Sequence, residues 1–361
     1  MKKIILKTSF FIIPFLGLYL FTKIFYEKDK GDLFRLGYII DFENYNRSDI
    51  FKEDYKTKKI FNNVSEINLN DSINYDVLTI GDSFSEQENL GYQNALAKLN
   101  NTKILHLDNY LNNNPIETLN SFLNGNVLDK IKVKYIILES VERLFVQRRE
   151  FDTKKIIDID SLSNNIKKNK DKIKNEISKK ESKEDFFSRE TLKFSLTNIY
   201  YLFDDNAFKS QTYRVKTNHK LFSVNDNRLL FFEEDIKNIS INNDNKNIIK
   251  LNNILNNLSE RLSKKGMKLI VIPCPDKLDF YYEFISEKSK YTKPIFFDTY
   301  QNLPKKYFFI NSKKILLEKG KNMKDLYFFD DTHWSPKASN IIAKELKNII
   351  NINDTKNNKF L

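Results

Sequence analysis

The 361-residue chain has a single cysteine, Cys274, and only three histidines. One cysteine excludes an intramolecular disulfide and a cysteine-based zinc site, and we expect Cys274 to pack as a small apolar side chain after a strand. The candidates for an imidazole base are therefore His106, His219 and His333. No spacing of histidines, cysteines and carboxylates is typical of a metal cluster, so we predict no metal and no cofactor.

The chain is basic but lacks the features of a nucleic-acid-binding protein. Its net charge is +12, and its basic residues are mostly lysines scattered through sequence rich in asparagine and isoleucine. Arginine clusters and recognisable nucleic-acid motifs are missing. We therefore predict no nucleic-acid partner and regard weak attraction to anionic glycans or membranes as secondary. The apolar content of 40%, with 30 phenylalanines and 18 tyrosines, is sufficient for a substantial core.

The N-terminal stretch is the longest apolar segment of the chain. Lys2, Lys3 and Lys7 precede a strongly apolar run over residues 8–26, interrupted by Lys23. This pattern predicts a membrane anchor over residues 1–30 with the N-terminus in the cytoplasm and residues 31–361 outside it. A cleaved signal peptide is the alternative, although the residues after the apolar run offer no small-x-small cleavage site.

Strand and helix patterns alternate along the rest of the chain. Apolar runs predict strands over residues 77–80, 103–107, 135–138, 268–272 and 307–310. Amphipathic patterns predict helices over residues 92–99, 116–123, 249–265 and 336–350, the last capped by Ser335 with Pro336 in its first turn. A basic, partly exposed insertion covers about 152–212, and residues 213–232 form a β-rich excursion. We predict an α/β fold whose mostly parallel sheet carries the site at the carboxyl ends of its strands.

Two short motifs are predicted to meet at that edge. Gly81-Asp82-Ser83-Phe84 directly follows the first strand, and Asp330-Asp331-Thr332-His333-Trp334-Ser335-Pro336 precedes the last helix. An exposed hydroxyl, an imidazole base and an orienting acid are what nucleophilic acyl chemistry requires. If the backbone before His333 is extended, Asp331 orients the imidazole; if it already turns into helix, Asp330 does.

These motifs resemble a known family. Gly81-Asp82-Ser83 is similar to the first block of the SGNH (GDSL) hydrolases, and residues 331–336 resemble the closing motif of their alginate O-acetylation branch, the AlgX/AlgJ-like proteins. Residues 139–144 are similar to the Glu-x-x-Glu-Arg segment of that branch, and Pro275-Asp276-Lys277 with Tyr281 to its Pro-x-Lys…Tyr segment. The resemblance covers roughly residues 70–150 and 210–350.

The resemblance implies a flavodoxin-like three-layer α/β/α sandwich in which Ser83 is acylated and His333 acts as base and then acid. The AlgX/AlgJ-like pattern favours Asp331 as the orienting acid, and the Asp-x-x-His of the wider family favours Asp330. The chain lacks the glycine and asparagine that supply that family's oxyanion hole. Backbone N–H groups of the turn that contains Asn112 and Asn113, or the side chain of Arg143, are the replacement donors.

Several nearby residues have a structural explanation beside a functional one. We expect Arg143 to form a buried ion pair with Glu139 or Glu142, and Lys277 and Tyr281 to form a wall of the fold. Trp334 and Phe84 are packing residues that could alternatively stack on a sugar. His106 and His219 do not join the site. These residues are named as candidates for binding the oxyanion or the substrate: Asn112, Asn113, Arg143 and Trp334.

The predicted anchor and the resemblance together imply a membrane-anchored, extracytoplasmic O-acetyltransferase or acyl esterase that acts on a cell-surface polysaccharide. Ser83 would take an acyl group delivered by a membrane-bound partner. The sequence does not settle whether sugar or water then deacylates the enzyme, but the anchor and the AlgX/AlgJ-like motifs favour transfer to sugar. The alternative is a catalytically weak glycan-binding or polysaccharide-assembly protein with the same fold.

Overall fold

A single six-stranded sheet forms the centre of the computed structural model, which describes residues 2–25, 30–40, 45–69, 71, 73–179, 196–224 and 227–357. The strand order is β1-β4-β3-β6-β9-β10, and each neighbouring pair is parallel. The strand bounds are β1 Asn62–Asn63, β3 Val77–Ile80, β4 Ile104–Leu107, β6 Tyr135–Val141, β9 Lys268–Cys274 and β10 Phe308–Phe309.

Leaving out the short edge strand β1, the other five strands have the order of a flavodoxin-like sheet. From β3 the chain moves outward to β4, then returns past β3 to β6, β9 and β10. In chain order this is 2-1-3-4-5, with the reversal between β3 and β6. Ligands of such sheets bind outside the carboxyl ends of the strands at that reversal. The predicted α/β fold with a mostly parallel sheet is confirmed.

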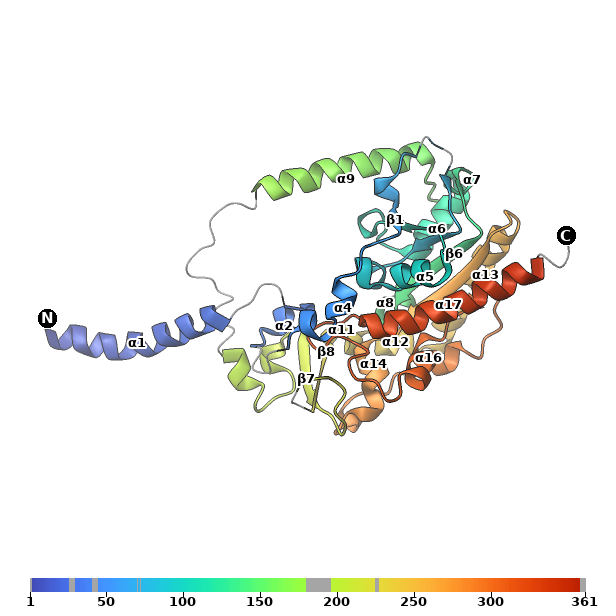
Figure 1. Ribbon diagram of the computed structural model, residues 1–361. Coiled ribbons are helices and arrows are strands. Elements are labelled where there is room, and N and C mark those ends of the chain that lie inside the picture. Colours follow the sequence, from blue (N-terminus) through green and yellow to red (C-terminus); the bar gives the residue numbers. More distant parts are fainter. Residues whose placement is uncertain are drawn as a thin grey trace.

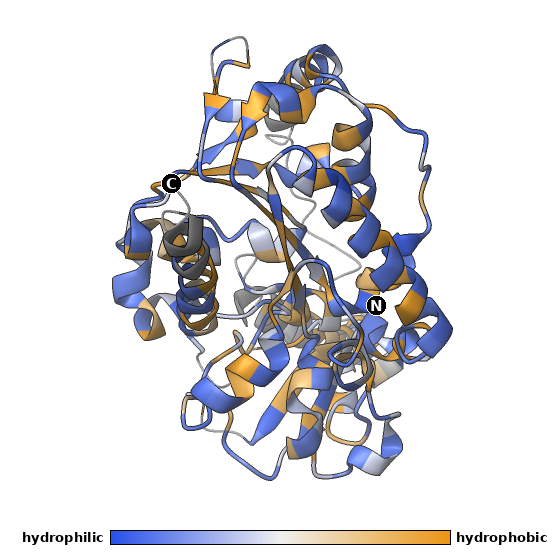
Figure 2. Cartoon of the chain, turned by 90° about the vertical axis from the view of Figure 1, so that its right-hand side faces the viewer, coloured by the Kyte–Doolittle hydropathy of each residue, from blue (hydrophilic) through white to orange (hydrophobic). Residues whose placement is uncertain are grey.

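Helices cover both faces of the sheet because successive strand residues point to opposite sides. Val77 and Ile137 belong to a core with helices α5, α16 and α17, whereas Leu78 and Ile136 belong to a second core with α6 and α13. Figure 2 shows apolar strand residues in the interior and polar outer surfaces on the helices. The helix bounds are α5 Tyr92–Asn100, α6 Pro115–Asn124, α13 Asn245–Ser263, α16 Ser312–Lys319 and α17 Pro336–Asn357.

The helix ends follow from local sequence. The Ser335 hydroxyl accepts a hydrogen bond from the N–H of Lys337 at 3.2 Å, so α17 begins with the predicted cap and Pro336. Asn114 caps α6 in the same way, through the N–H groups of Ile116 and Glu117. Gly266 follows α13 with a φ of +76°, a conformation that side chains disfavour.

The predicted insertion contains the long helix α9 (Ile159–Lys179), in which Leu162 and Ile166 are buried. Residues 180–195 of the insertion lie outside the described residues. The predicted β-rich excursion is an antiparallel pair, β7 Thr212–Lys216 and β8 Arg228–Phe232. A second small parallel pair joins β2 Ile73–Asn74 to β5 Ile131–Lys132.

Short helices fill the remaining connections. Near the N-terminus these are α2 Asp32–Gly37, α3 Arg47–Ile50 and α4 Lys52–Tyr55. Later ones are α7 Val127–Lys130, α8 Glu142–Phe145, α11 Glu233–Lys237, α12 Ile239–Asn242, α14 Lys277–Tyr281 and α15 Phe296–Tyr300. The 3₁₀ turns are η1 Val64–Glu66, η2 Ser83–Ser85, η3 Glu88–Leu90, η4 Asn109–Leu111, η5 Gln147–Arg149, η6 Ala207–Lys209, η7 Tyr282–Phe284 and η8 Lys288–Lys290.

The N-terminal segment forms helix α1 (Lys2–Phe25), which extends away from the sheet in Figure 1. Among the described residues, no helix combines the length and the apolar character needed to cross a membrane. The predicted transmembrane anchor is therefore not supported by the structure. Residues 26–29, at the end of the predicted segment, lie outside the described residues.

Candidate functional site

Ser83 lies at the carboxyl end of β3, next to the reversal of strand order. It opens the 3₁₀ turn η2 and is partly exposed, whereas Phe84 and Ser85 behind it are buried. The short connection from strand to turn places Ser83 at the edge of the sheet formed by the carboxyl ends of the strands. The N–H of Ser83 at this turn remains a candidate oxyanion donor.

The turn that carries Ser83 rests on a buried glutamate from the neighbouring strand. Oε2 of Glu139 accepts hydrogen bonds from the N–H of Asp82 at 3.0 Å and from the Ser85 hydroxyl at 2.8 Å. A Cβ atom on Gly81 would collide with the Ser85 hydroxyl and the Glu139 carboxyl. The glycine in the motif is therefore needed because the turn sits directly on Glu139.

The pKa values of two buried carboxyl groups that support the turn, Asp82 and Glu139, are shifted in opposite directions. Burial raises the pKa of Glu139 well above its usual range, and the charge of Asp82 raises it further. Burial also opposes the ionisation of Asp82, but the charge of Arg148 and hydrogen bonds to its carboxylate lower the pKa of Asp82. Its Oδ2 accepts from the N–H of Val141 at 2.8 Å and from Arg148. The two shifts favour an ionised Asp82 beside a protonated Glu139.

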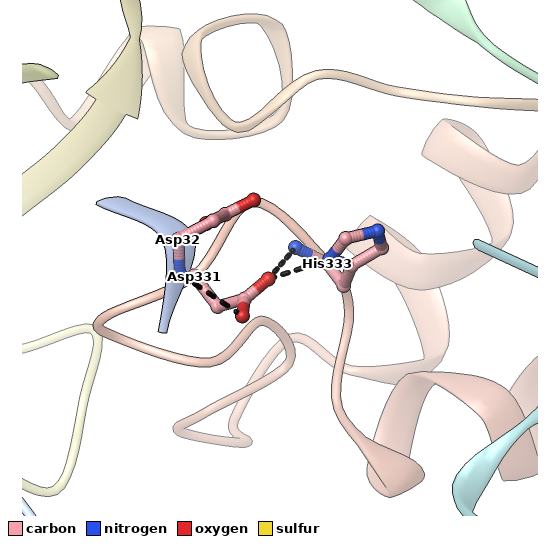
Figure 3. Close-up of side chains that lie close together, drawn as sticks. All are labelled: Asp32, Asp331 and His333. Atoms are coloured by element: carbon pink, nitrogen blue, oxygen red, sulfur yellow. Dashed lines mark hydrogen bonds and ion pairs between the residues drawn. The ribbon is translucent and has the colours of Figure 1, made fainter. Parts of the chain in front are cut away.

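The imidazole of His333 is bound to Asp331. Nδ1 of His333 lies 2.5 Å from Oδ1 of Asp331, which also accepts the backbone N–H of His333 at 3.1 Å. Figure 3 shows the two side chains facing each other, with Asp32 beside them. Because an ionised carboxylate only accepts, the Nδ1 atom carries the proton and Nε2 is left as the basic nitrogen.

The charges of this pair stabilise each other. Burial alone would lower the pKa of His333, but the charge and hydrogen bond of Asp331, with the charge of Asp32, raise it above its ordinary value. Burial of Asp331 acts against its ionisation, but His333 and Arg47 hold its pKa well below its usual range. The pair therefore favours an imidazolium once a proton arrives at Nε2.

Asp330 faces away from the imidazole. Its Oδ2 accepts the N–H of Gly31 at 2.7 Å, and its Oδ1 accepts from Nε of Arg47 at 2.6 Å. Nη2 of the same guanidinium donates to Oδ2 of Asp331 at 2.8 Å. Of the two predicted acids, the structure thus places Asp331 against His333 and ties Asp330 to the N-terminal segment.

Lys277 holds the loop that carries Asp331 and His333 through three backbone carbonyl groups. Its Nζ donates to the carbonyl oxygens of Phe328, Phe329 and Asp331 at 2.9, 3.0 and 3.1 Å. Burial lowers the pKa of Lys277 to about 7, whereas three carbonyl acceptors favour the charged form with its three donors. Lys277 and the fully buried Tyr281 thus form the predicted wall of the fold.

The two motifs meet through aromatic rings. The Phe84 ring lies 4.8 Å from that of His333 and 5.2 Å from that of Trp334, measured between centroids. The Gln87 side chain also donates to the Trp334 carbonyl at 3.1 Å. Among the described residues Nε2 of His333 has no hydrogen-bond partner, so it is not bonded to Ser83. Catalytic hydrogen bonds are often long before substrate binds.

The asparagines predicted to bind an oxyanion have different surroundings. Asn112 is buried, and its Nδ2 donates to the Gly81 carbonyl at 2.8 Å while its Oδ1 accepts from Thr118 at 2.7 Å. Asn113 is exposed. Asn112 therefore supports the turn that carries Ser83 through its side-chain amide.

Two predicted substrate contacts need correction. Trp334 is fully buried against Phe84 and Tyr92, so its ring offers no face to a sugar. Arg143 pairs through Nη1 with Asp276 at 2.7 Å and Asp235 at 3.5 Å, not with Glu139 or Glu142. The predicted partners were wrong because Glu139 points toward the Ser83 turn and Glu142 accepts the N–H of Asp276.

The remaining histidines and the cysteine lie outside the meeting point of the two motifs. His106 is buried and contacts the Thr79 hydroxyl at 2.8 Å, and His219 is exposed against Phe284. Cys274 is buried at the end of β9, as predicted, and its thiol donates to Oε1 of Glu139 at 3.3 Å.

One group of side chains has the geometry to hold a cation. Asp32, Asp331 and His333 each offer a ligand atom, and these atoms lie within 4.8 Å of one another. Their oxygens are already engaged, because Asp32 accepts from the N–H and hydroxyl of Thr332 and Asp331 accepts from Arg47 and His333. The hydrogen bonds and the adjacent guanidinium favour proton transfer over metal binding at this place.

Sequence reasoning missed Asp32, Arg47 and Arg148, all of which bind residues of the two motifs. Asp32 and Arg47 come from the N-terminal segment, which lies outside the motifs that carry the family resemblance. One signal in the sequence could have found the arginines, because arginine is scarce in a chain whose basic residues are mostly lysine. Three of the few arginines, Arg47, Arg143 and Arg148, pair with carboxylates near the site.

Comparison with known proteins gives one match. Residues 227–360 match the family model of the SGNH hydrolase-like domain of acetyltransferase AlgX. The match includes Lys277, Asp331 and His333 but not Ser83, which precedes it in the chain. It confirms the resemblance to the SGNH-like AlgX branch over this part of the chain. No curated protein and no solved structure matches the chain.

Proposed function

We propose, from the AlgX-type SGNH domain matched by residues 227–360, that this protein is an O-acyltransferase or acyl esterase that forms an acetyl ester on Ser83. The observation that carries the proposal is the bond between His333 Nδ1 and Asp331, which leaves Nε2 basic beside the loop of Ser83. An imidazole oriented in this way is what a serine nucleophile needs as its base.

The proposed reaction has two halves. The Ser83 oxygen attacks the carbonyl carbon of an acyl donor while its proton passes to Nε2 of His333, and the leaving oxygen then takes that proton. In the second half Nε2 accepts the proton of a hydroxyl, whose oxygen attacks the ester carbonyl. Ser83 regains its proton and the acyl group leaves on the new oxygen.

The acceptor distinguishes the two activities, since a sugar hydroxyl gives transfer and water gives hydrolysis. We favour transfer to a cell-surface polysaccharide, because the matched domain is that of an acetyltransferase. An extracytoplasmic location and a membrane-bound partner that delivers the acyl group are parts of the same proposal. Arg143 stays a proposed substrate contact, because its charge lies close enough to affect the pKa of His333. Its guanidinium also pairs with two carboxylates, Asp235 and Asp276.

The test is covalent labelling with an activated acetyl ester, followed by mass spectrometry. The proposal expects one acetyl group on Ser83 in the native protein, none on that site in Ser83→Ala, and a slower reaction in His333→Ala. Ser263→Ala and His219→Ala, which change an exposed serine and an exposed histidine elsewhere, should label like the native protein.

Adding an oligosaccharide then shows whether the acetyl group moves to sugar or to water. An absence of acetyl-Ser83 in folded native protein would contradict the enzyme proposal and favour the alternative, a glycan-binding or assembly protein with this fold.

A further inference from the structure

The base loop of the site (residues 328–334) is covered by a segment from the opposite end of the chain. We call this segment, residues 30–40 and 45–51, the N-terminal strap. The N–H groups of Leu33 and Phe34 donate to the Asp330 carbonyl at 3.1 and 3.4 Å. The Tyr45 hydroxyl accepts the N–H of Phe329 at 3.2 Å. The strap is thus hydrogen-bonded along the loop that presents His333.

The strap can lie this close only because residue 31 is glycine. A Cβ atom on Gly31 would collide with the guanidinium of Arg47 and with the backbone of Asp330. Aromatic contacts hold the strap on either side, with Tyr45 against Phe329 and Phe51 against Phe328. These contacts fix the strap relative to the loop, so its charged side chains have defined positions.

Two of those charged side chains reach the acid–base pair. Arg47 bridges Asp330 and Asp331, with Nε on the former and Nη2 on the latter. Asp32 accepts hydrogen bonds from the N–H of Thr332 at 2.8 Å and from the Thr332 hydroxyl at 2.5 Å. Thr332 is the residue between Asp331 and His333. Figure 3 shows Asp32 beside Asp331. The strap therefore adds one positive and one negative charge to the pair.

We propose that Arg47 and Asp32 are positioning residues of the site, which hold Asp331 and the His333 loop in register for proton transfer. This inference rests on the proposed function, because it gives both residues a role in the same acyl transfer. Arg47 fixes the second oxygen of Asp331, so that the first stays directed at Nδ1 of His333. Asp32 fixes the residue between them.

The two residues bring opposite charges to the acid–base pair, Asp32 beside His333 and Arg47 beside Asp331. The charge of Asp32 is one cause of the raised pKa of His333, and Arg47 lowers the pKa of Asp331. The other charged groups around the imidazole are Asp331, Asp330, Lys277 beneath the loop and Arg143 from α8. A segment that only covered apolar surface would not produce opposite effects through two residues on the same strap.

The test is the titration of the His333 imidazole by NMR in the full chain, with His333→Ala to assign its signal among the three histidines. Asp32→Asn removes a negative charge and should lower the pKa of His333. Arg47→Met removes a positive charge and should raise it. Lys52→Met and Asp49→Asn, which change exposed charges of the same region, should leave it unchanged.

The rate of Ser83 acetylation in the same samples tests whether the strap also fixes the position of Asp331. Arg47→Met should slow acetylation about tenfold through misplacement of the acid. Arg47→Lys should keep the pKa of His333 near that of the native protein yet remain slow, because an ammonium cannot bridge two carboxylates as a guanidinium does. Asp32→Asn keeps the size of the side chain and Arg47→Lys keeps its charge. These two variants therefore still test the inference if Arg47→Met does not fold.

The outcomes separate this inference from the proposed function. Shifts of the His333 pKa in the same direction in both variants, or no shift in either, would overturn the role of the strap even if Ser83 is acetylated normally. Opposite shifts without any acetyl-Ser83 would support the strap and overturn the acyl chemistry.

Discussion

The turn that carries Ser83 and the loop that carries His333 are supported in different ways. The Ser83 turn rests on strand ends of the central sheet: Glu139 from β6 accepts its N–H, and Asn112 after β4 holds the carbonyl of Gly81. The His333 loop is held by Lys277 from α14 and by Gly31, Asp32 and Arg47 from the N-terminal strap.

This difference indicates two kinds of support for one site. The Ser83 turn is supported by neighbours within the sheet, whose places follow from the strand order. The His333 loop depends on a charge network whose members lie up to 300 residues apart in the chain. We expect substitution of the buried Glu139 to act mainly on stability, and substitutions around Asp331 to act mainly on the proposed reaction.

The largest expected effect is that of the orienting acid. Asp331→Asn should slow acetylation of Ser83 by about 10³-fold or more, because an amide can hold the imidazole in the wrong tautomer. Asp330→Asn should cost about tenfold or less, since Asp330 binds the strap and not the imidazole. Rates of labelling measure both, and equal losses would contradict the assignment of Asp331 as the acid.

On the nucleophile side, Glu139→Ala should lower the free energy of unfolding by about 3 kcal/mol, since it leaves a cavity and unpaired donors at Asp82 and Ser85. Glu139→Gln should cost only about 1 kcal/mol, because the amide keeps the size and an acceptor oxygen and the raised pKa of Glu139 favours an uncharged group there. Urea unfolding measures both values. A glutamine variant as unstable as the alanine variant would mean that Glu139 is ionised.

A smaller effect is expected at the asparagine turn. Asn112→Ala should slow acetylation of Ser83 about tenfold, because Gly81 loses the amide that holds its carbonyl. Asn113→Ala is the matched control, since the Asn113 side chain is exposed and its backbone N–H is unchanged. The reverse order of the two losses would show that Asn113 acts through its side chain.

The smallest effect is a dependence of stability on pH. The raised pKa of His333 means that the folded state binds its proton more tightly than the unfolded state. The stability from this proton is fully present below the ordinary histidine pKa and is lost as the pH rises through the folded value. The difference in unfolding free energy between the native protein and His333→Ala should therefore shrink from acidic to alkaline pH. A difference that grew with pH would contradict the raised pKa.

The fold was readable where local signals were strong. The apolar run over Val77–Ile80 and the cap at Ser335 gave β3 and the start of α17 at the residues found. The strand over residues 135–138 was predicted too short, because β6 continues through Glu139 and Ser140 to Val141. Polar residues normally indicate the end of a buried strand, whereas Glu139 is accommodated by its hydrogen bonds beneath the turn.

The candidate site was readable only in part. The serine, histidine and aspartate motifs identified Ser83, His333 and Asp331, whose catalytic roles stay a prediction. Arg47 was out of reach because it binds Asp331 across 284 residues, and nothing in its own neighbourhood marks it. The partners of Arg143 were predicted from proximity in sequence, but they come from α11 and the end of β9.

The bonds between the strap and the base loop also set an order of events during biosynthesis. The strap is synthesised before its partners around Asp330, because 283 residues separate Arg47 from Asp330. Contacts between such distant parts of a chain form slowly, since a long loop must close first. The strands that carry Ser83 and Glu139 can thus assemble before the loop of His333 is fixed, and a chain that ends before residue 330 contains the Ser83 turn without Asp331 and His333.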